Sequence, residues 1–114
     1  MSADRFKGNW KFYSMTESGN SGKDEKRGTM HCNKVVNSKL SCDYLIYMKK
    51  NTQTNQKWES VDLDKSPVKY TFTVNERNIK IGGWKGYLTE GQVMWIVANG
   101  MATWTKIRKL HSEQ

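Results

Sequence analysis

The sequence is poor in the residues and patterns that mark several common classes of protein. It holds one proline, two cysteines and no long apolar run among its 114 residues. A membrane-spanning helix requires about 18 or more consecutive apolar residues, so we expect no transmembrane segment. The start of the chain, MSADRFK, contains no apolar stretch either. This predicts a cytoplasmic protein, or a secreted one if a signal peptide was removed before this numbering.

The cysteines, Cys32 and Cys42, are too few for a disulfide framework, and neither a CxxC pair nor a Cys/His cluster is present. A three-residue hairpin loop centred on Asn37 would place them opposite each other on two strands. Thiols in a cytosol stay reduced. We therefore predict two free, half-buried thiols, with a bonded pair across the hairpin as the alternative.

Signs of catalysis or metal binding are equally sparse. The histidines are His31 and His111, and only His31 neighbours a cysteine, Cys32, toward which it could act as a base. A strand histidine beside a cysteine is more often structural. Asp62 and Asp64 are too isolated for a hard-metal site, which requires more oxygen ligands. We expect no enzymatic activity, no metal and no cofactor.

Positive charge is what the chain does have. The net charge is +8, from 19 Lys and Arg against 11 Asp and Glu, and the cations are dispersed rather than gathered in a long run. Such a balance favours anionic partners, among them nucleic acid, an acidic protein, a membrane surface or an acidic ligand. The alternative is that the charge serves solubility alone.

The strongest structural signal is a hairpin between Gln92 and Leu110. Asn99-Gly100 separates two apolar and β-branched runs, and Asn-Gly suits a type I′ turn because both central residues need a positive φ. A two-residue loop at this position places Trp95 directly opposite Trp104.

Side chains alternate along a strand, so the hairpin has two unlike faces. We interpret the first face as packing surface; it carries Met94, Ile96, Ala98, Met101, Thr103, Thr105 and Ile107. The second face combines two tryptophans with cations, and we expect function there; it carries Val93, Trp95, Val97, Ala102, Trp104, Lys106 and Arg108.

Together with this hairpin, the chain predicts about eight short strands separated by turn residues, with no convincing helix. This pattern is typical of an all-β meander, so we predict one domain over residues 1–114, a single antiparallel up-and-down β-barrel. The polar segment from Thr16 to Arg27 has no helical apolar period, and we interpret it as a mobile loop or lid.

Both ends of the chain resemble one superfamily. The segment FKGNWKF, from Phe6 to Phe12, resembles the glycine-x-tryptophan opening of the calycins, which include lipocalins, cytosolic fatty-acid-binding proteins and avidins. The segment TWTKIRK, from Thr103 to Lys109, is similar to their basic closing strand. The resemblance implies a barrel around a ligand cavity. It also implies that a closing-strand cation, Arg108, packs over Trp10 and seals one end, a cation–π contact on the order of 1 kcal/mol.

The resemblance does not extend to a particular ligand. The helical lid of the fatty-acid-binding proteins is replaced by the short polar segment, and their arginine-x-tyrosine becomes Lys106-Ile107-Arg108. The opening strand also lacks the polar residues by which an avidin holds biotin. We therefore predict neither a fatty acid nor biotin as the ligand.

We predict that the barrel binds a small hydrophobic or amphipathic anionic ligand in its interior. An aromatic wall with a few convergent polar groups is typical of a small-molecule pocket. The predicted ligand-binding residues are Trp95, Trp104, Lys106, Tyr44 and Tyr70. If the tryptophan face points outward instead, aromatic stacking beside cations favours single-stranded nucleic acid. An acidic protein partner is the third alternative.

Overall fold

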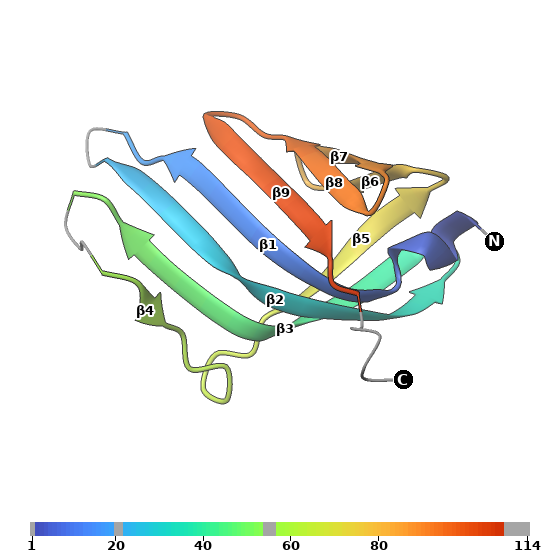
Figure 1. The fold of residues 1–114 in the computed structure, drawn as a ribbon, viewed down its shortest axis with the longest axis horizontal. Coiled ribbons are helices and arrows are strands. Elements are labelled where there is room, and N and C mark those ends of the chain that lie inside the picture. Colours follow the sequence, from blue (N-terminus) through green and yellow to red (C-terminus); the bar gives the residue numbers. More distant parts are fainter. Residues whose placement is uncertain (1, 20–21, 54–56, 109–114) are drawn as a thin grey trace.

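The computed structural model describes residues 2–19, 22–53 and 57–108. In this part of the chain, one 3₁₀ helix precedes a series of strands (Figure 1). The elements are η1 (Ser2–Phe6), β1 (Gly8–Glu17), β2 (Lys23–Val36), β3 (Lys39–Asn51), β4 (Glu59–Ser60), β5 (Lys69–Asn75), β6 (Asn78–Ile81), β7 (Trp84–Thr89), β8 (Gln92–Ile96) and β9 (Gly100–Lys106). None of these described elements is a helix long and apolar enough to span a membrane.

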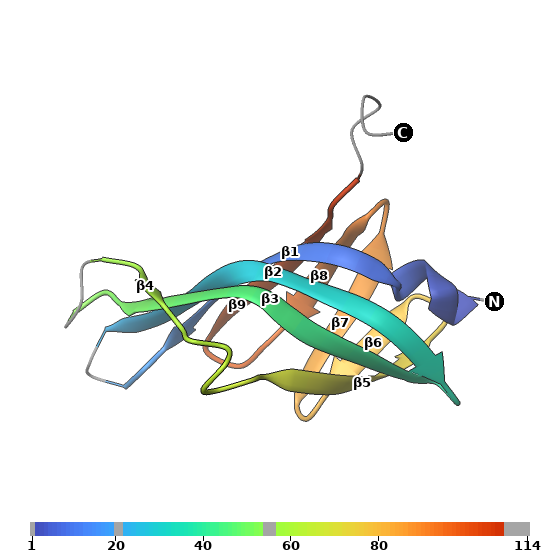
Figure 2. The ribbon, with the colours of Figure 1, turned by 90° about the horizontal axis from the view of Figure 1, so that it is seen from below.

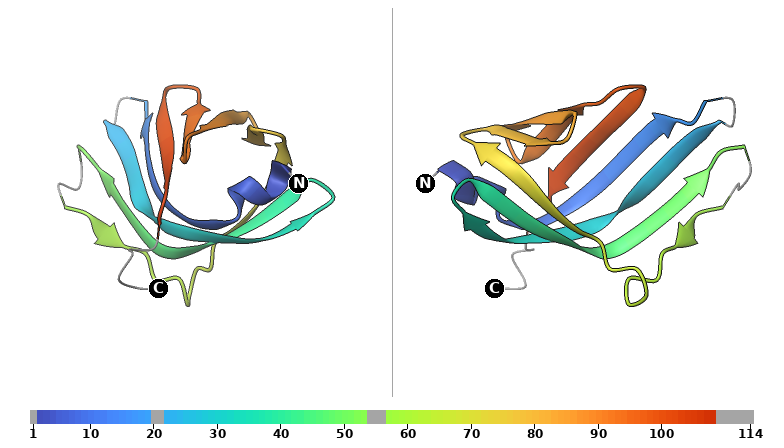
Figure 3. Two further views of the ribbon diagram at one scale, coloured as in Figure 1. Left: turned by 45° about the vertical axis from the view of Figure 1, so that its right-hand side comes forward. Right: turned by 180° about the vertical axis from the view of Figure 1, so that it is seen from behind.

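The strands close into a barrel. Apart from β4, each described strand pairs antiparallel with the next in sequence, and β9 returns to pair with β1. Figure 3 looks into the resulting ring, and Figure 2 shows the curved sheet of β1, β2 and β3 from below. The short strand β4 pairs with β3 alone. The prediction of an all-β, up-and-down antiparallel barrel of about eight strands is confirmed.

The described residues of the predicted loop, 16–19 and 22–27, are mostly strand and do not form the lid that their polarity suggests, and residues 20–21 lie outside the described part of the chain. β1 continues to Glu17 and β2 begins at Lys23, and these two residues pair with each other. The beginning of β2 also pairs with the end of β3, from Asp24↔Asn51 to Arg27↔Met48. Strand formation here is imposed by neighbours on both sides, which supply backbone partners to residues with little apolar content.

The final hairpin has a different register from the predicted one. Trp95 pairs with Ala102 and Val93 pairs with Trp104, so the pairing is displaced by two residues. Asn99 has a positive φ but Gly100 does not, because Gly100 already belongs to β9 and pairs with Thr16 of β1. A Cβ atom at Gly100 would lie 2.0 Å from the carbonyl oxygen of Met15. Glycine is therefore required here by the close approach of two strands and not by the turn.

A displacement of two residues leaves the alternation intact, so the two faces of the hairpin keep their predicted members. The face that we predicted to be packing surface is exposed instead. Met94 is 55% exposed and Ile96 is 78% exposed, whereas Trp95 and Trp104 are buried inside the barrel. The apolar face of the hairpin is its outer surface, and the tryptophan face is the inner one.

The two cysteines are bonded and buried, and the prediction of free, half-buried thiols is wrong. Cys32 and Cys42 form a disulfide between β2 and β3. The hairpin loop is also shorter than predicted: Asn37 and Ser38, both with positive φ, form a two-residue turn. A bulge at Asn33 then shifts the register by one residue and brings the two cysteines opposite each other.

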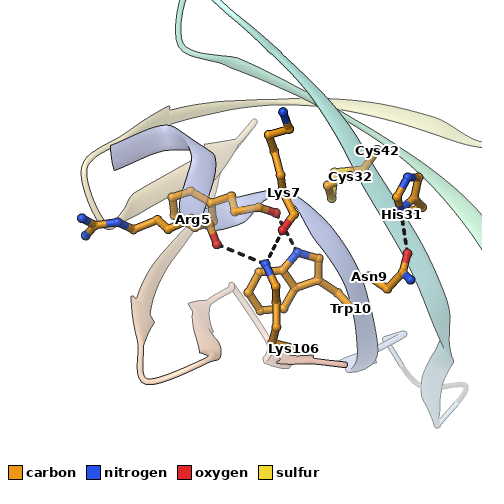
Figure 4. Close-up of a disulfide and its surroundings, with 9 residues drawn as sticks. Arg5, Lys7, Asn9, Trp10, His31, Cys32, Cys42 and Lys106 are labelled. Carbon is orange, nitrogen blue, oxygen red and sulfur yellow. Dashed lines mark hydrogen bonds between the residues drawn. A yellow bond between two sulfur atoms is a disulfide. The ribbon is translucent and has the colours of Figure 1, made fainter. Parts of the chain in front are cut away.

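The barrel is closed at the end where η1 lies. Trp10 is fully buried there and donates its indole N–H to the carbonyl of Phe6, at 2.8 Å. Lys106 pairs with Trp10 across β1 and β9, and its ammonium lies 4.7 Å from the indole centroid. The same ammonium donates to the carbonyls of Arg5 and Lys7 (Figure 4). The cation over Trp10 is therefore Lys106 and not Arg108, the residue that we predicted.

Candidate ligand-binding site

A cavity of about 410 Å³ lies inside the barrel, toward the end away from η1. Its volume is within the range of small-molecule sites. The β6–β7 turn, Gly82-Gly83, contributes to its rim. The lining is mainly aromatic and apolar: Phe12, Tyr13, Ser14, Lys26, Met30, Tyr44, Tyr70, Phe72, Ile81, Gly82, Gly83, Trp84, Trp95, Ala102 and Trp104.

One wall of the cavity is built around Trp95. The strands on either side place small residues next to it, because Gly86 of β7 and Ala102 of β9 are its register partners. A Cβ atom at Gly86 would lie 2.9 Å from the indole of Trp95, so glycine leaves room for that ring. The indole then meets Trp104 edge-on, with the two ring centroids 5.3 Å apart, and Phe72 at 5.8 Å.

The opposite wall is a cluster of phenyl and phenol rings. Phe12 and Tyr44 have centroids 4.7 Å apart, and Tyr44 stacks on Tyr47 at 4.6 Å and meets Tyr70 edge-on at 5.5 Å. Burial raises the pKa of Tyr44 far above its ordinary value, and the neighbouring hydroxyl of Tyr70 contributes to this shift. The hydroxyl of Tyr44 therefore stays protonated at neutral pH, and its hydrogen bond with Tyr70 favours the protonated form.

The polar side-chain groups of the cavity lining are hydroxyls, indole N–H groups and one ammonium. Lys26 is the only charged residue in the lining among the described residues, and the lining includes no carboxylate. Ser14 is a buried polar residue on the same wall as Phe12. Across the described residues, the one buried side-chain nitrogen or oxygen without a hydrogen-bond partner is Nε1 of Trp95. An unpaired buried donor costs about 1–3 kcal/mol, so it stands out in a native fold.

Four of the five predicted ligand-binding residues meet at this cavity: Trp95, Trp104, Tyr44 and Tyr70. Their role in binding stays a prediction. Lys106 is not in the cavity lining, since its ammonium is held at the closed end over Trp10. Lys26 is not among the predicted residues, because the polar sequence around it favours a loop. The alternation of Tyr70 and Phe72 along β5 was the available signal for Phe72.

The structure does not form the arrangement in which His31 acts as a base toward the thiol of Cys32. Cys32 is bonded to Cys42, and the ring of His31 pairs instead with the amide oxygen of Asn9, at 2.6 Å (Figure 4). His111 lies outside the described residues. Within the described ranges, histidine, cysteine and carboxylate side chains form no group of three or more that could hold a metal ion.

Comparison of the chain with protein-family models, with curated protein sequences and with solved structures gives no match.

Proposed function

We propose that this protein is a calycin-like binding protein that holds a small, amphipathic anionic ligand inside its barrel. The observation that carries the proposal is the cavity itself: an aromatic enclosure with a cation, several hydroxyl groups and no carboxylate in its described lining. Enclosed apolar walls favour the body of such a ligand, and a single cation favours its charged end. The tryptophan–lysine contact at the closed end is the counterpart of the calycin closing pair, with Lys106 in place of Arg108.

The polar groups also suggest how the ligand is oriented. Lys26 is an exposed residue of the lining, so the charged end of the ligand lies beside it, where water can still reach the charge. The body of the ligand packs between Trp95 and Trp104 on one side and Tyr44 on the other. A hydrogen-bond acceptor that reached the indole N–H of Trp95 would satisfy the buried donor that lacks a partner.

The nucleic-acid alternative depended on an outward tryptophan face. Trp95 is 7% exposed and Trp104 is 5% exposed, so these rings offer no outer platform on which bases could stack. The interior site is for that reason the function that we favour.

A substitution on one strand tests the proposal with a matched control. Ala102→Leu places extra volume in the cavity wall, whereas Thr103→Leu adds the same side chain to the adjacent position, outside the lining. The probe is anilinonaphthalene sulfonate, an amphipathic anion whose fluorescence rises in apolar sites. We expect Ala102→Leu to weaken probe binding about tenfold, or about 1.4 kcal/mol, and Thr103→Leu to change it less than about twofold.

An uncharged probe separates the contribution of the Lys26 charge to binding from that of the apolar cavity. Lys26→Met should weaken binding of the sulfonate about fivefold and leave binding of phenylnaphthylamine, its uncharged analogue, unchanged. Lys11→Met, outside the cavity lining on β1, is the matched control. Equal affinity of wild type and Ala102→Leu for both probes would remove the interior site. An equal loss of affinity for both probes in Lys26→Met would show that the Lys26 charge does not contribute to ligand binding.

A further inference from the structure

A second recess lies at the other end of the barrel, and it differs in character from the cavity. It has a volume of about 700 Å³ and is formed by η1, the β5–β6 turn, the β7–β8 turn and the end of β9. We call it the closed-end groove. Its lining is Arg5, Trp10, Arg77, Tyr87, Leu88, Thr89, Glu90, Gly91 and Lys106.

Cations from separate parts of the chain converge on this groove. Arg5 comes from η1, Arg77 from the β5–β6 turn and Lys106 from β9. Arg108 lies beside them, because its guanidinium is 3.5 Å from the position that a Cβ atom of Gly91 would take. The described lining offers one carboxylate, that of Glu90. Several cations that line one recess give it a positive potential, which attracts anions.

The groove is also shaped for a ligand larger than a simple ion. Glu90 and Gly91 both have positive φ, so the β7–β8 turn is tight, and both residues line the groove. Arg77 is anchored by a hydrogen bond of 3.3 Å from its guanidinium to the carbonyl of Leu88. Tyr87 is half exposed on the same wall. An anchored arginine suits the planar, bidentate recognition of phosphate oxygens.

We propose that the closed-end groove is a second binding site, separate from the interior cavity, and that it takes a phosphate-rich anion bearing several charges. Arg5, Arg77 and Arg108 would neutralise the phosphate oxygens, and the volume of the groove would accommodate two or more linked phosphates. This site gives part of the net positive charge a specific use, which the mostly neutral cavity does not.

Titration with inorganic triphosphate tests the site. Isothermal calorimetry at about 50 mM salt should detect one site whose affinity falls as the salt concentration rises. The double variant Arg5→Gln/Arg77→Gln should bind at least tenfold more weakly. The control, Lys80→Gln/Lys85→Gln, removes the same charge from two exposed, paired residues of β6 and β7 outside this groove, and should change the affinity less than twofold.

Equal losses in the two double variants, or no binding by the wild type, would overturn the proposal. Nuclear magnetic resonance of the unmodified protein keeps the test independent of folding defects: triphosphate should shift the backbone amides of Glu90 and Gly91. Shifts confined to other regions would contradict the site. Anilinonaphthalene sulfonate reports on the interior cavity. Arg5→Gln/Arg77→Gln should therefore bind this probe as the wild type does while it loses affinity for triphosphate, and an equal loss of affinity for both ligands would contradict two separate sites.

Discussion

The two ends of this barrel use the same residue types for different purposes. At the closed end, Trp10 is fully buried, its N–H has an acceptor, and Lys106 covers its ring. At the other end, Trp95 lines a cavity and its N–H has no acceptor among the described residues. The indole of Trp10 is therefore packed and its donor is satisfied, whereas the indole of Trp95 borders a cavity and its donor is unsatisfied.

This difference teaches that burial alone does not distinguish a structural tryptophan from a candidate binding residue. Trp10 and Trp104 are in contact, with centroids 5.4 Å apart, yet one belongs to the seal and the other to the cavity wall. What separates them is the completeness of packing and hydrogen bonding around each ring. We infer that the packing around Trp10 serves stability, whereas Trp95 and Trp104 serve the interior ligand site.

Removing the disulfide is the strongest test of that division. Cys32→Ala/Cys42→Ala opens a loop with a sequence separation of 10, so we expect the free energy of unfolding to fall by about 2–3 kcal/mol. Urea unfolding measures this loss. Affinity for the fluorescent probe, measured on the folded fraction, should change less than about twofold. A large loss of probe affinity with little loss of stability would contradict this division, because the disulfide would then serve ligand binding more than stability.

Replacing the sealing cation gives a smaller effect. Lys106→Met removes the contact over Trp10 and the bonds to two carbonyls, at an expected cost of about 1–2 kcal/mol. Arg108→Met, on the same chain segment, is the matched control and should cost less than about 0.5 kcal/mol. Thermal unfolding of both variants ranks them. If Arg108→Met were the more destabilising variant, Arg108 and not Lys106 would be the cation that stabilises the closed end.

The smallest effect is a pH dependence of opposite sign at the two ends. Burial raises the pKa of Tyr44 and of Tyr47, which stack on each other, and lowers the pKa of Lys106, which covers Trp10 at the closed end. A tyrosine with a raised folded-state pKa stabilises the fold below its unfolded-state value of about 10, and this contribution is lost as the pH rises through the folded-state pKa. For Lys106 the penalty on the charged form is present below its folded-state pKa and is relieved as the pH rises toward 10.5.

Two substitutions separate these contributions. Between pH 8 and 11, the stability of Tyr44→Phe should fall less steeply than that of the wild type, because one late-titrating phenol is gone. The stability of Lys106→Met should fall more steeply, because the opposing gain is gone. Urea unfolding at each pH supplies the slopes. Identical slopes for all three proteins would show that these groups do not couple to folding.

The sequence predicted the class of fold because alternation is a local property. The alternation of Trp10, Phe12 and Ser14 on β1 corresponds to their burial in the barrel, and the faces of the last hairpin have the predicted members. Four of the predicted site residues lie in the cavity lining for the same reason. Which face of the last hairpin points into the barrel cannot be predicted from local sequence, because it depends on how the distant strands close the barrel.

The errors have a common physical origin in contacts between distant strands. The register of β8 and β9 depends on the approach of Gly100 to Met15, a residue of β1. Lys106 and Arg108 share one face in the sequence pattern, and the pairing of Lys106 with Trp10 selects between them. Lys26 was missed because its strand is polar and forms only between two partners.

The most direct test of an interior site follows the indole N–H resonances of the five tryptophans during titration with anilinonaphthalene sulfonate. The account predicts large shifts for Trp95 and Trp104, which line the cavity, and little change for Trp58, which lies against Arg27 outside the cavity lining. Trp10, sealed beneath Lys106, should shift less than Trp104. Shifts centred on Trp58, or small and equal shifts for all five, would contradict an interior ligand site.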